Sequence, residues 1–139
     1  MVPIYDHGEV SDRLAIYDLY ARYVHFADAF QHDELDSVFE PDAVIDWSEA
    51  GYKTMTWSEA KADPLMGGRL FSHAFHINAN ILIRFAVGRL AAEVVSKTVN
   101  PVGVTRSGGV VDSYQVHGGY LDRLVRRTDG WRIAHRVWL

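Results

Sequence analysis

The feature that most constrains the fold is the order of the hydrophobic patterns, which are helical near the N-terminus and β-like from residue 75 onward. Residues 11–30 contain no Gly or Pro and have helically spaced apolar side chains, which predicts a long helix capped by Ser11 or Asp12. Strand patterns fill the later chain: ILIRF (81–85), AAEVVSKTV (91–99), VVDSYQVHGGYLDRLVRR (110–127) and WRIAHRVWL (131–139). This order predicts an α+β fold, a cone-shaped, curved antiparallel sheet with the N-terminal helices packed on its concave face.

Shorter patterns lie between these segments. Residues 33–39 and a stretch after Trp57 predict short helices, AVIDW (43–47) predicts a strand, and the Asp129–Gly130 pair predicts a hairpin turn. A chain of 139 residues is long enough for one substantial core, so we expect a single domain over residues 1–139.

Composition excludes several classes of partner and chemistry. The net charge is -4 and basic residues form no long run, so neither nucleic acid nor an anionic membrane is an expected partner. No stretch approaches the ~20 apolar residues of a membrane helix, and MVPIYDHGEV shows no secretory signal, which makes the cytoplasm the expected location. The absence of cysteine excludes disulfides, thiolate nucleophiles and Cys-ligated zinc.

Two polar residues stand out as candidates for chemistry. Asp28 ends the predicted helix on a face that it shares with Tyr17, Tyr20, Ala21 and Val24, at ~100° per residue. A carboxylate there opposes the helix dipole unless a partner compensates, although the end of the helix is also where solvent begins. His76 precedes a strand in which His76, Asn78 and Asn80 share one side. Periodicity leaves open whether that side faces a cavity or solvent.

Other histidines offer alternatives. His25 lies three residues before Asp28 on the helix and is a rival partner for it. His73 is expected at the edge of any cavity, and His32 in the turn after the helix. A metal site built from His73, His76 and a carboxylate would not match a known ligand spacing, so we predict no metal and no cofactor.

The segments DLYARYVHFADAFQHDELDSVFEPDAVIDW, HINANI and YLDRLVRRTDGWRIAHR together resemble the SnoaL-like branch of the nuclear transport factor 2-like superfamily. The resemblance runs from about Leu14 to Arg136 and implies an α+β cone with a deep apolar pocket. Members include scytalone dehydratase, hexachlorocyclohexane dehydrochlorinase, bile-acid dehydratases, ketosteroid isomerase and polyketide cyclases, together with non-enzymatic binding modules.

In the dehydratase and dehydrochlorinase group an aspartate ends the first helix and a histidine begins a later strand, and the two form a base dyad. Asp28 and His76 match these positions. The lysine five residues before the aspartate is replaced by Tyr23, which adds no positive charge, and Arg136 matches the arginine of the final strand. The resemblance therefore implies catalytic roles for Asp28 and His76. Candidate substrate-binding residues are Tyr20, Tyr23, Val24, Trp47, Phe71, Asn80 and Arg136.

A neutral imidazole is a suitable base for an acidic C–H proton, and a carboxylate on its other nitrogen fixes the tautomer. The expected function is a cofactor-independent lyase of the dehydratase type that acts on a small, fairly apolar molecule. An isomerase or polyketide cyclase-like enzyme with the same dyad, and a binding module without turnover, remain alternatives. The convex face of such a sheet is expected to pack in a homodimer or homotrimer.

Overall fold

The computed structural model describes residues 4–139. Residues 1–3, the start of the segment MVPIYDHGEV in which we expect no secretory signal, lie outside this range. The α-helices (α), 3-10 helices (η) and strands (β) are α1 (His7–Asp28), η1 (Glu34–Ser37), β1 (Phe39–Asp46), η2 (Ser48–Ala50), β2 (Thr54–Thr56), α2 (Trp57–Ala62), β3 (His73–Ala74), β4 (Ile77–Phe85), η3 (Val87–Arg89), β5 (Ala91–Thr105), β6 (Val111–Arg127) and β7 (Gly130–Trp138). Within the described range, no helix is both long and apolar enough to cross a lipid bilayer.

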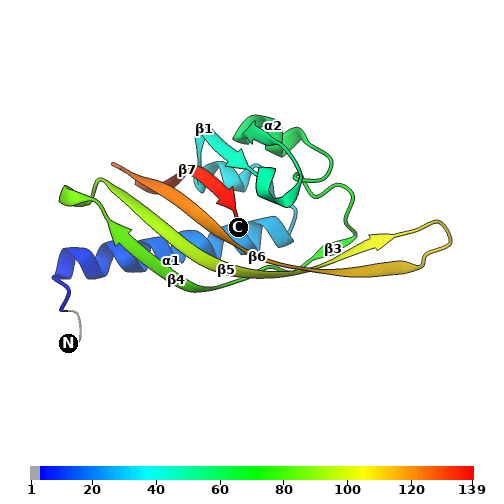
Figure 1. Ribbon diagram of the computed structural model, residues 1–139, viewed down its shortest axis with the longest axis horizontal. Coiled ribbons are helices and arrows are strands. Elements are labelled where there is room, and N and C mark those ends of the chain that lie inside the picture. Colours follow the sequence, from blue (N-terminus) through cyan, green and yellow to red (C-terminus); the bar gives the residue numbers. More distant parts are fainter. Residues whose placement is uncertain (1–3) are drawn as a thin grey trace.

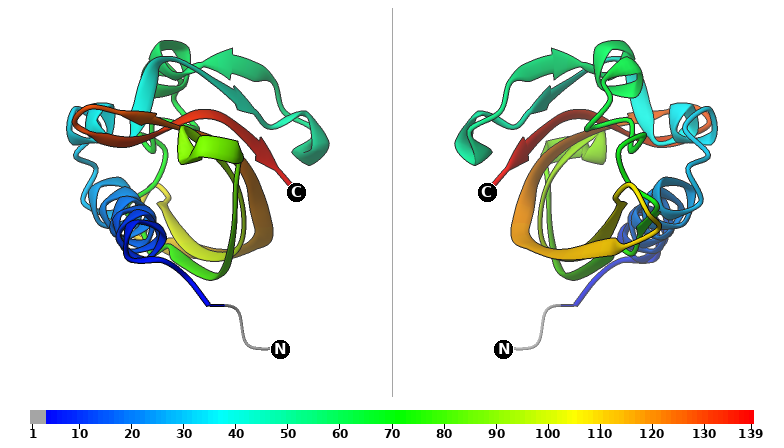
Figure 2. Two further views of the ribbon diagram at one scale, coloured as in Figure 1. Left: turned by 90° about the vertical axis from the view of Figure 1, so that its left-hand side faces the viewer. Right: turned by 90° about the vertical axis from the view of Figure 1, so that its right-hand side faces the viewer.

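The fold is α+β with a strongly curved sheet, as predicted from the sequence. Its strands run in the order β2-β1-β7-β6-β5-β3, and β4 pairs with β5 beside β3 (Figure 1). The long β5–β6 hairpin and the β6–β7 hairpin are antiparallel, whereas β1 pairs with β7 in parallel, so the sheet is mixed. Figure 2 shows the sheet curving around an interior that α1 closes on one side. This arrangement positions the end of α1 against the start of β4.

The long helix begins earlier than the sequence predicts. Asp6 caps it, since its carboxylate accepts the backbone N–H of Glu9 at 2.7 Å, so Ser11 and Asp12 lie inside the helix and are not its caps. The buried face also differs from the predicted one, because Tyr17 and Ala21 are exposed. The residues that α1 buries against the sheet are Asp12, Ile16, Leu19, Tyr20 and Tyr23.

Two short elements differ from expectation in type or start. The helix predicted over residues 33–39 is only the 3-10 helix η1, and β1 already begins at Phe39 rather than at residue 43. The helix predicted after Trp57 is present as α2, where Thr56 and Glu59 form a reciprocal capping box. Both elements border the cavity described below.

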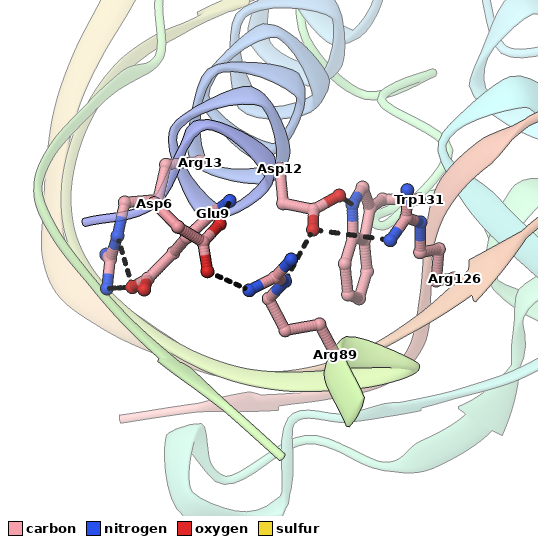
Figure 3. A network of polar contacts seen from close by, with 7 residues as sticks. All are labelled: Asp6, Glu9, Asp12, Arg13, Arg89, Arg126 and Trp131. Atoms are coloured by element: carbon pink, nitrogen blue, oxygen red, sulfur yellow. Dashed lines mark hydrogen bonds and ion pairs between the residues drawn. The ribbon is translucent and has the colours of Figure 1, made fainter. Parts of the chain in front are cut away.

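A polar network fastens the N-terminal part of α1 to the sheet (Figure 3). The carboxylate of Asp12 is buried and contacts Arg89 Nε at 3.2 Å and Arg126 Nη1 at 3.3 Å. It also accepts the indole N–H of Trp131 at 3.3 Å. Because a buried carboxylate is costly without partners, these three donors make the position of Asp12 tolerable.

Candidate active site

A cavity of about 340 Å³ lies between α1, α2 and the inner face of the sheet, and its walls are mainly apolar. Aromatic and aliphatic side chains supply most of the wall, and segments around residues 50–52 and 65–71 complete it. The polar or ionisable side chains on the wall include those of His32, Lys61, His76, Asn100 and Arg136. Pockets of this size and lining are typical of sites for small molecules.

Asp28 and His76 meet at this cavity. Asp28 is the last residue of α1, and His76 directly precedes β4. Nδ1 of His76 lies 2.6 Å from Oδ1 of Asp28, and the backbone N–H of His76 donates to the same carboxylate at 2.9 and 3.0 Å. The imidazole is therefore held through both its ring and its backbone, which fixes its orientation against the cavity.

The other ring nitrogen of His76 faces Asn100, a residue of β5. Nδ2 of Asn100 lies 2.8 Å from Nε2 of His76. An amide NH₂ can only donate, so Nε2 accepts, and the ring proton belongs on Nδ1 beside the carboxylate. Burial lowers the pKa of His76 from its ordinary value, although the hydrogen bond and charge of Asp28 oppose this effect. The imidazole of His76 is thus neutral near pH 7, with its proton on Nδ1 beside Asp28 and its Nε2 lone pair accepting from Asn100.

Arg136 supplies a positive charge to the same wall. Its Nε and Nη2 each donate to the carboxylate of Asp122 at 2.8 Å, and both residues are almost fully buried. The guanidinium carbon lies 3.9 Å from the ring centre of Tyr120 and 4.2 Å from that of Tyr23. Tyr20 donates its hydroxyl to Asp122, and burial, followed by the charge of Asp122, raises its pKa well above the ordinary value. This network keeps an arginine charged and rigid beside the cavity.

Several predicted site residues line the cavity together. Tyr23 is in edge-on contact with the ring of His76, with centroids 5.8 Å apart, and its hydroxyl lies 3.3 Å from that of Tyr120. The predicted residues found on the wall are Tyr23, Trp47, Phe71, His76 and Arg136. Asp28 lies behind His76, as an orienting partner would.

Three predicted residues do not reach the cavity wall. Tyr20 is buried beneath it and binds Asp122, and Val24 packs against the core. Asn80 is exposed, because it adopts φ +53° and the β4–β5 pairing shifts between Ala79 and Leu82. The bulge reverses the faces of the strand, so His76 and Asn78 point inward before it, and Ile81 and Ile83 point inward after it.

The three histidines considered as alternatives to His76 make no hydrogen bond or ion pair to Asp28. His25 is exposed on α1, and His73 in β3 is exposed and does not line the cavity. His32 lines the cavity, where burial, with the charges of Arg69 and Lys61 as smaller causes, lowers its pKa. Over residues 4–139, no three His, Asp or Glu side chains are grouped so as to hold a metal ion.

Sequence reasoning missed Asn100, Tyr120 and Asp122. Asn100 follows Ser96 and Thr98 along β5 in an alternation that resembles a solvent-facing strand, yet Ser96 and Thr98 are buried. Asp122 and Arg136 are direct cross-strand partners of β6 and β7. The sequence indicates the Asp122–Arg136 pair only through the opposite charges in the strand segments YLDRLVRR and WRIAHR, and these do not fix the register.

Comparisons with known proteins agree with this architecture. The pattern that defines the family described as SnoaL-like domain matches residues 8–137. An uncharacterized protein of Mycobacterium tuberculosis is 33% identical over 133 residues, which cover 94% of this chain and 86% of that protein. The chain is also similar to a protein assigned as a scytalone dehydratase from Novosphingobium aromaticivorans, with TM-score 0.80, 23% identity, and 93% and 83% of the two chains covered.

A third similar structure is a hexachlorocyclohexane dehydrochlorinase from Novosphingobium barchaimii, with TM-score 0.76 and 20% identity over 94% of this chain and 86% of that chain. At such identities the structural matches establish the fold, and the relative from M. tuberculosis carries no assigned activity. The reaction must therefore be argued from the residues of the cavity itself.

Proposed function

The chain belongs to the SnoaL-like domain family, and from that membership and the cavity geometry we propose that it is a cofactor-independent lyase of the dehydratase type, acting on a small, fairly apolar molecule. The observation that carries the proposal is the 2.6 Å contact between Asp28 and His76 at an apolar cavity. A carboxylate on Nδ1 orients the imidazole and stabilises the imidazolium that forms when Nε2 takes a proton.

In the proposed reaction His76 removes a proton from a substrate carbon. The electron pair of the broken C–H bond forms a double bond as a hydroxyl group leaves the neighbouring carbon. The proton held on Nε2 then passes to the departing hydroxyl, so that water is released and His76 returns to its neutral form. Arg136, fixed by Asp122, stabilises the negative charge that develops on the substrate.

One contact favours a second candidate, a ligand-binding module without turnover. The Nε2 lone pair that a base needs is already in contact with Nδ2 of Asn100. In an enzyme the substrate must displace this amide, whereas in a binding module the contact persists in the complex. An isomerase with the same dyad differs from the lyase only in the fate of the abstracted proton.

The test is a screen of hydroxylated and halogenated ring compounds, with product mass as the readout for loss of water or hydrogen halide. We expect His76→Gln and Asp28→Asn each to lower kcat by about 100-fold or more, the size of a general-base contribution. His73→Gln is the matched control, since it removes an exposed histidine three residues away and should leave turnover unchanged.

Full activity in His76→Gln would exclude the proposed base. A panel member that binds in the cavity at Nε2 distance but is never turned over would favour the binding module. Recovery of a rearranged substrate of unchanged mass would assign an isomerase instead.

A further inference from the structure

One edge of the sheet is open along half of its longest strand. β6 has 17 residues, but β7 pairs with it only from Tyr120 onward. Leu139 extends this pairing by one position, where it exchanges two backbone hydrogen bonds with Gly119 at 3.0 and 3.3 Å. Over residues 4–139, no backbone group bonds to this side of residues 111–118, so the β5–β6 hairpin projects past the end of β7 with one free edge (Figure 1).

The pairing at Gly119 shows which backbone groups point to the open side. Both the N–H and the C=O of Gly119 face β7, so every second residue of β6 faces the same way, and the residues between them bond to β5. Ser113, Gln115 and His117 therefore direct their N–H and C=O groups to the open side, and all three residues are exposed. Such a row of free groups is a template for another strand.

The open segment lacks the features that usually keep edge strands from associating, which are Lys, Pro or a bulge. The sequence VDSYQVHGG (111–119) contains no Lys, Arg or Pro, and its register with β5 is continuous. Its one acidic side chain, Asp112, already forms an ion pair with Arg106. Val111 and Tyr114 are 47% and 53% exposed, so the segment also offers apolar surface.

The backbone of this segment is complementary to a second copy of itself. When two antiparallel strands pair about a two-fold axis, inward faces stay inward if Gln115 lies opposite the partner's Gln115. Ser113 then lies opposite the partner's His117, and both belong to the positions whose backbone groups are free. The tip of each hairpin ends beside the partner's Gly119, where Leu139 begins to occupy the edge, so the two open segments match in length.

The side chains agree with the same register. Tyr114 lies opposite the partner's Val116, and an aromatic side chain beside a β-branched one is a favourable cross-strand pair. Asp112 lies opposite the partner's Gly118, so no like charges meet. Because Val116 lines the cavity, the partner's Tyr114 would cover the cavity wall from its open side.

We propose that residues 111–119 form a dimerisation edge, which pairs antiparallel with the same residues of a second copy and joins the two sheets into one. The inference does not rest on the proposed function, because Asp28 and His76 take no part in the pairing. It differs from the convex-face packing expected from the sequence in the atoms that it uses. The edge pairs through backbone N–H and C=O groups, whereas the convex face would use outward side chains such as Leu82, which is 52% exposed.

The experiment measures the mass of the full chain by sedimentation over a range of protein concentrations. Gln115→Pro removes an N–H on the open side and places the proline ring in its way, while every hydrogen bond to β5 stays possible. Gln115→Thr is the matched control, since it changes the same side chain and keeps the N–H. Leu82→Glu places a charge on the convex face and tests the other interface.

We expect the wild type, Gln115→Thr and Leu82→Glu to be dimers, and Gln115→Pro to have half their mass. A wild type that is monomeric at every concentration, a Gln115→Pro variant that stays dimeric, or loss of the dimer in Leu82→Glu alone would overturn the proposal. A trimer would also contradict it, because a two-fold pairing of edges closes after two copies.

Amide hydrogen exchange of the wild type gives a second test that does not depend on how a variant folds. Ser113, Gln115 and His117 have their N–H groups on the open side, whereas those of Tyr114 and Val116 bond to β5 with or without a partner. We expect exchange at the first three residues to slow as the protein concentration rises, and exchange at the other two to stay constant. Unprotected open-side amides in a dimeric sample would show that the two copies meet elsewhere.

Discussion

Nδ2 of Asn100 lies 2.8 Å from Nε2 of His76, across the imidazole ring from Asp28. The ring is therefore held between an amide donor on one nitrogen and a carboxylate acceptor on the other. This pairing selects the neutral imidazole with its proton on Nδ1, which is the form a general base requires. It also means that the identity of residue 100 should control the protonation of His76.

Asn100→Asp tests this control. A carboxylate beside Nε2 prefers a protonated partner, so we expect the pKa of His76 to rise and the base to be largely protonated near neutral pH. The measurement is an NMR titration of the His76 ring carbon between its nitrogens. Thr98→Val, at a buried site on the same strand whose hydroxyl makes no hydrogen bond to His76, is the control and should leave the titration unchanged. A lowered pKa of His76 in Asn100→Asp would mean that the amide does not contact Nε2 in solution.

The pH dependence of stability follows from the lowered pKa of His76. In the unfolded chain the imidazole takes up a proton at about pH 6.5, whereas burial lowers the pKa of His76 and delays protonation in the folded protein to lower pH. Between the two pKa values the unfolded state binds more protons, so the unfolding free energy falls as pH falls through this window. Above this pH window, neutral His76 makes its full contribution to the unfolding free energy.

The measurement compares urea unfolding of the wild type and His76→Gln from pH 8 to pH 5. The stability advantage of the wild type should shrink as the pH decreases below about 6.5. Once a substrate is found, its turnover should decrease with falling pH below that value, because His76 becomes protonated. An advantage that grows toward acid pH would show that the folded state favours imidazolium, contrary to the burial argument.

A third prediction concerns the bulge at Asn80, which has φ +53°. A β-branched residue is strained in this region, so Asn80→Val should lower the unfolding free energy by about 1–2 kcal/mol. Asn80→Gly fits the same backbone and should stay within about 0.5 kcal/mol of the wild type. Arg84→Val, exposed on the same strand beyond the bulge, controls for strand propensity. Equal unfolding free energies for Asn80→Val and Arg84→Val would argue against the bulge.

This bulge also explains how far the sequence could predict the site. Helical periodicity over α1 and the later strand patterns suffice for the α+β class, because they reflect burial over many residues. One residue of positive φ reverses every side chain after it, and regular alternation could not reveal that Asn80 leaves the wall while His76 remains. The site depends on such single-residue events, and the fold does not.

Sequence reasoning missed Asn100 and Asp122 for a related reason. A polar residue on an alternating strand indicates solvent by default, but here the polar row of β5 faces inward, and Ser96 and Thr98 are buried. The partners that make this burial possible are distant in the sequence: His76, just before β4, for Asn100, and Arg136 in β7 for Asp122. Only the register brings them together, and no local pattern encodes it.

The network around Asp12 provides a prediction for stability that leaves the cavity intact. None of the residues drawn in Figure 3 lines the cavity. Asp12→Asn keeps the size of the side chain but removes the charge that Arg89 and Arg126 contact, so the unfolding free energy should fall by about 1.5–3 kcal/mol. Part of this loss should disappear in high salt, because both arginines are partly exposed.

The control for Asp12→Asn is Asp129→Asn, which disrupts the ion pair that the exposed Asp129 carboxylate makes with Arg132. An ion pair whose carboxylate is exposed to solvent contributes little, so its effect should stay within about 0.5 kcal/mol. Urea unfolding measures both variants, and turnover in the screen of ring compounds checks that the cavity is intact. If the two variants lose equal stability, the buried contacts of Asp12 do not fasten α1 to the sheet. If Asp12→Asn loses turnover while folded, the network and the cavity are coupled through the length of α1.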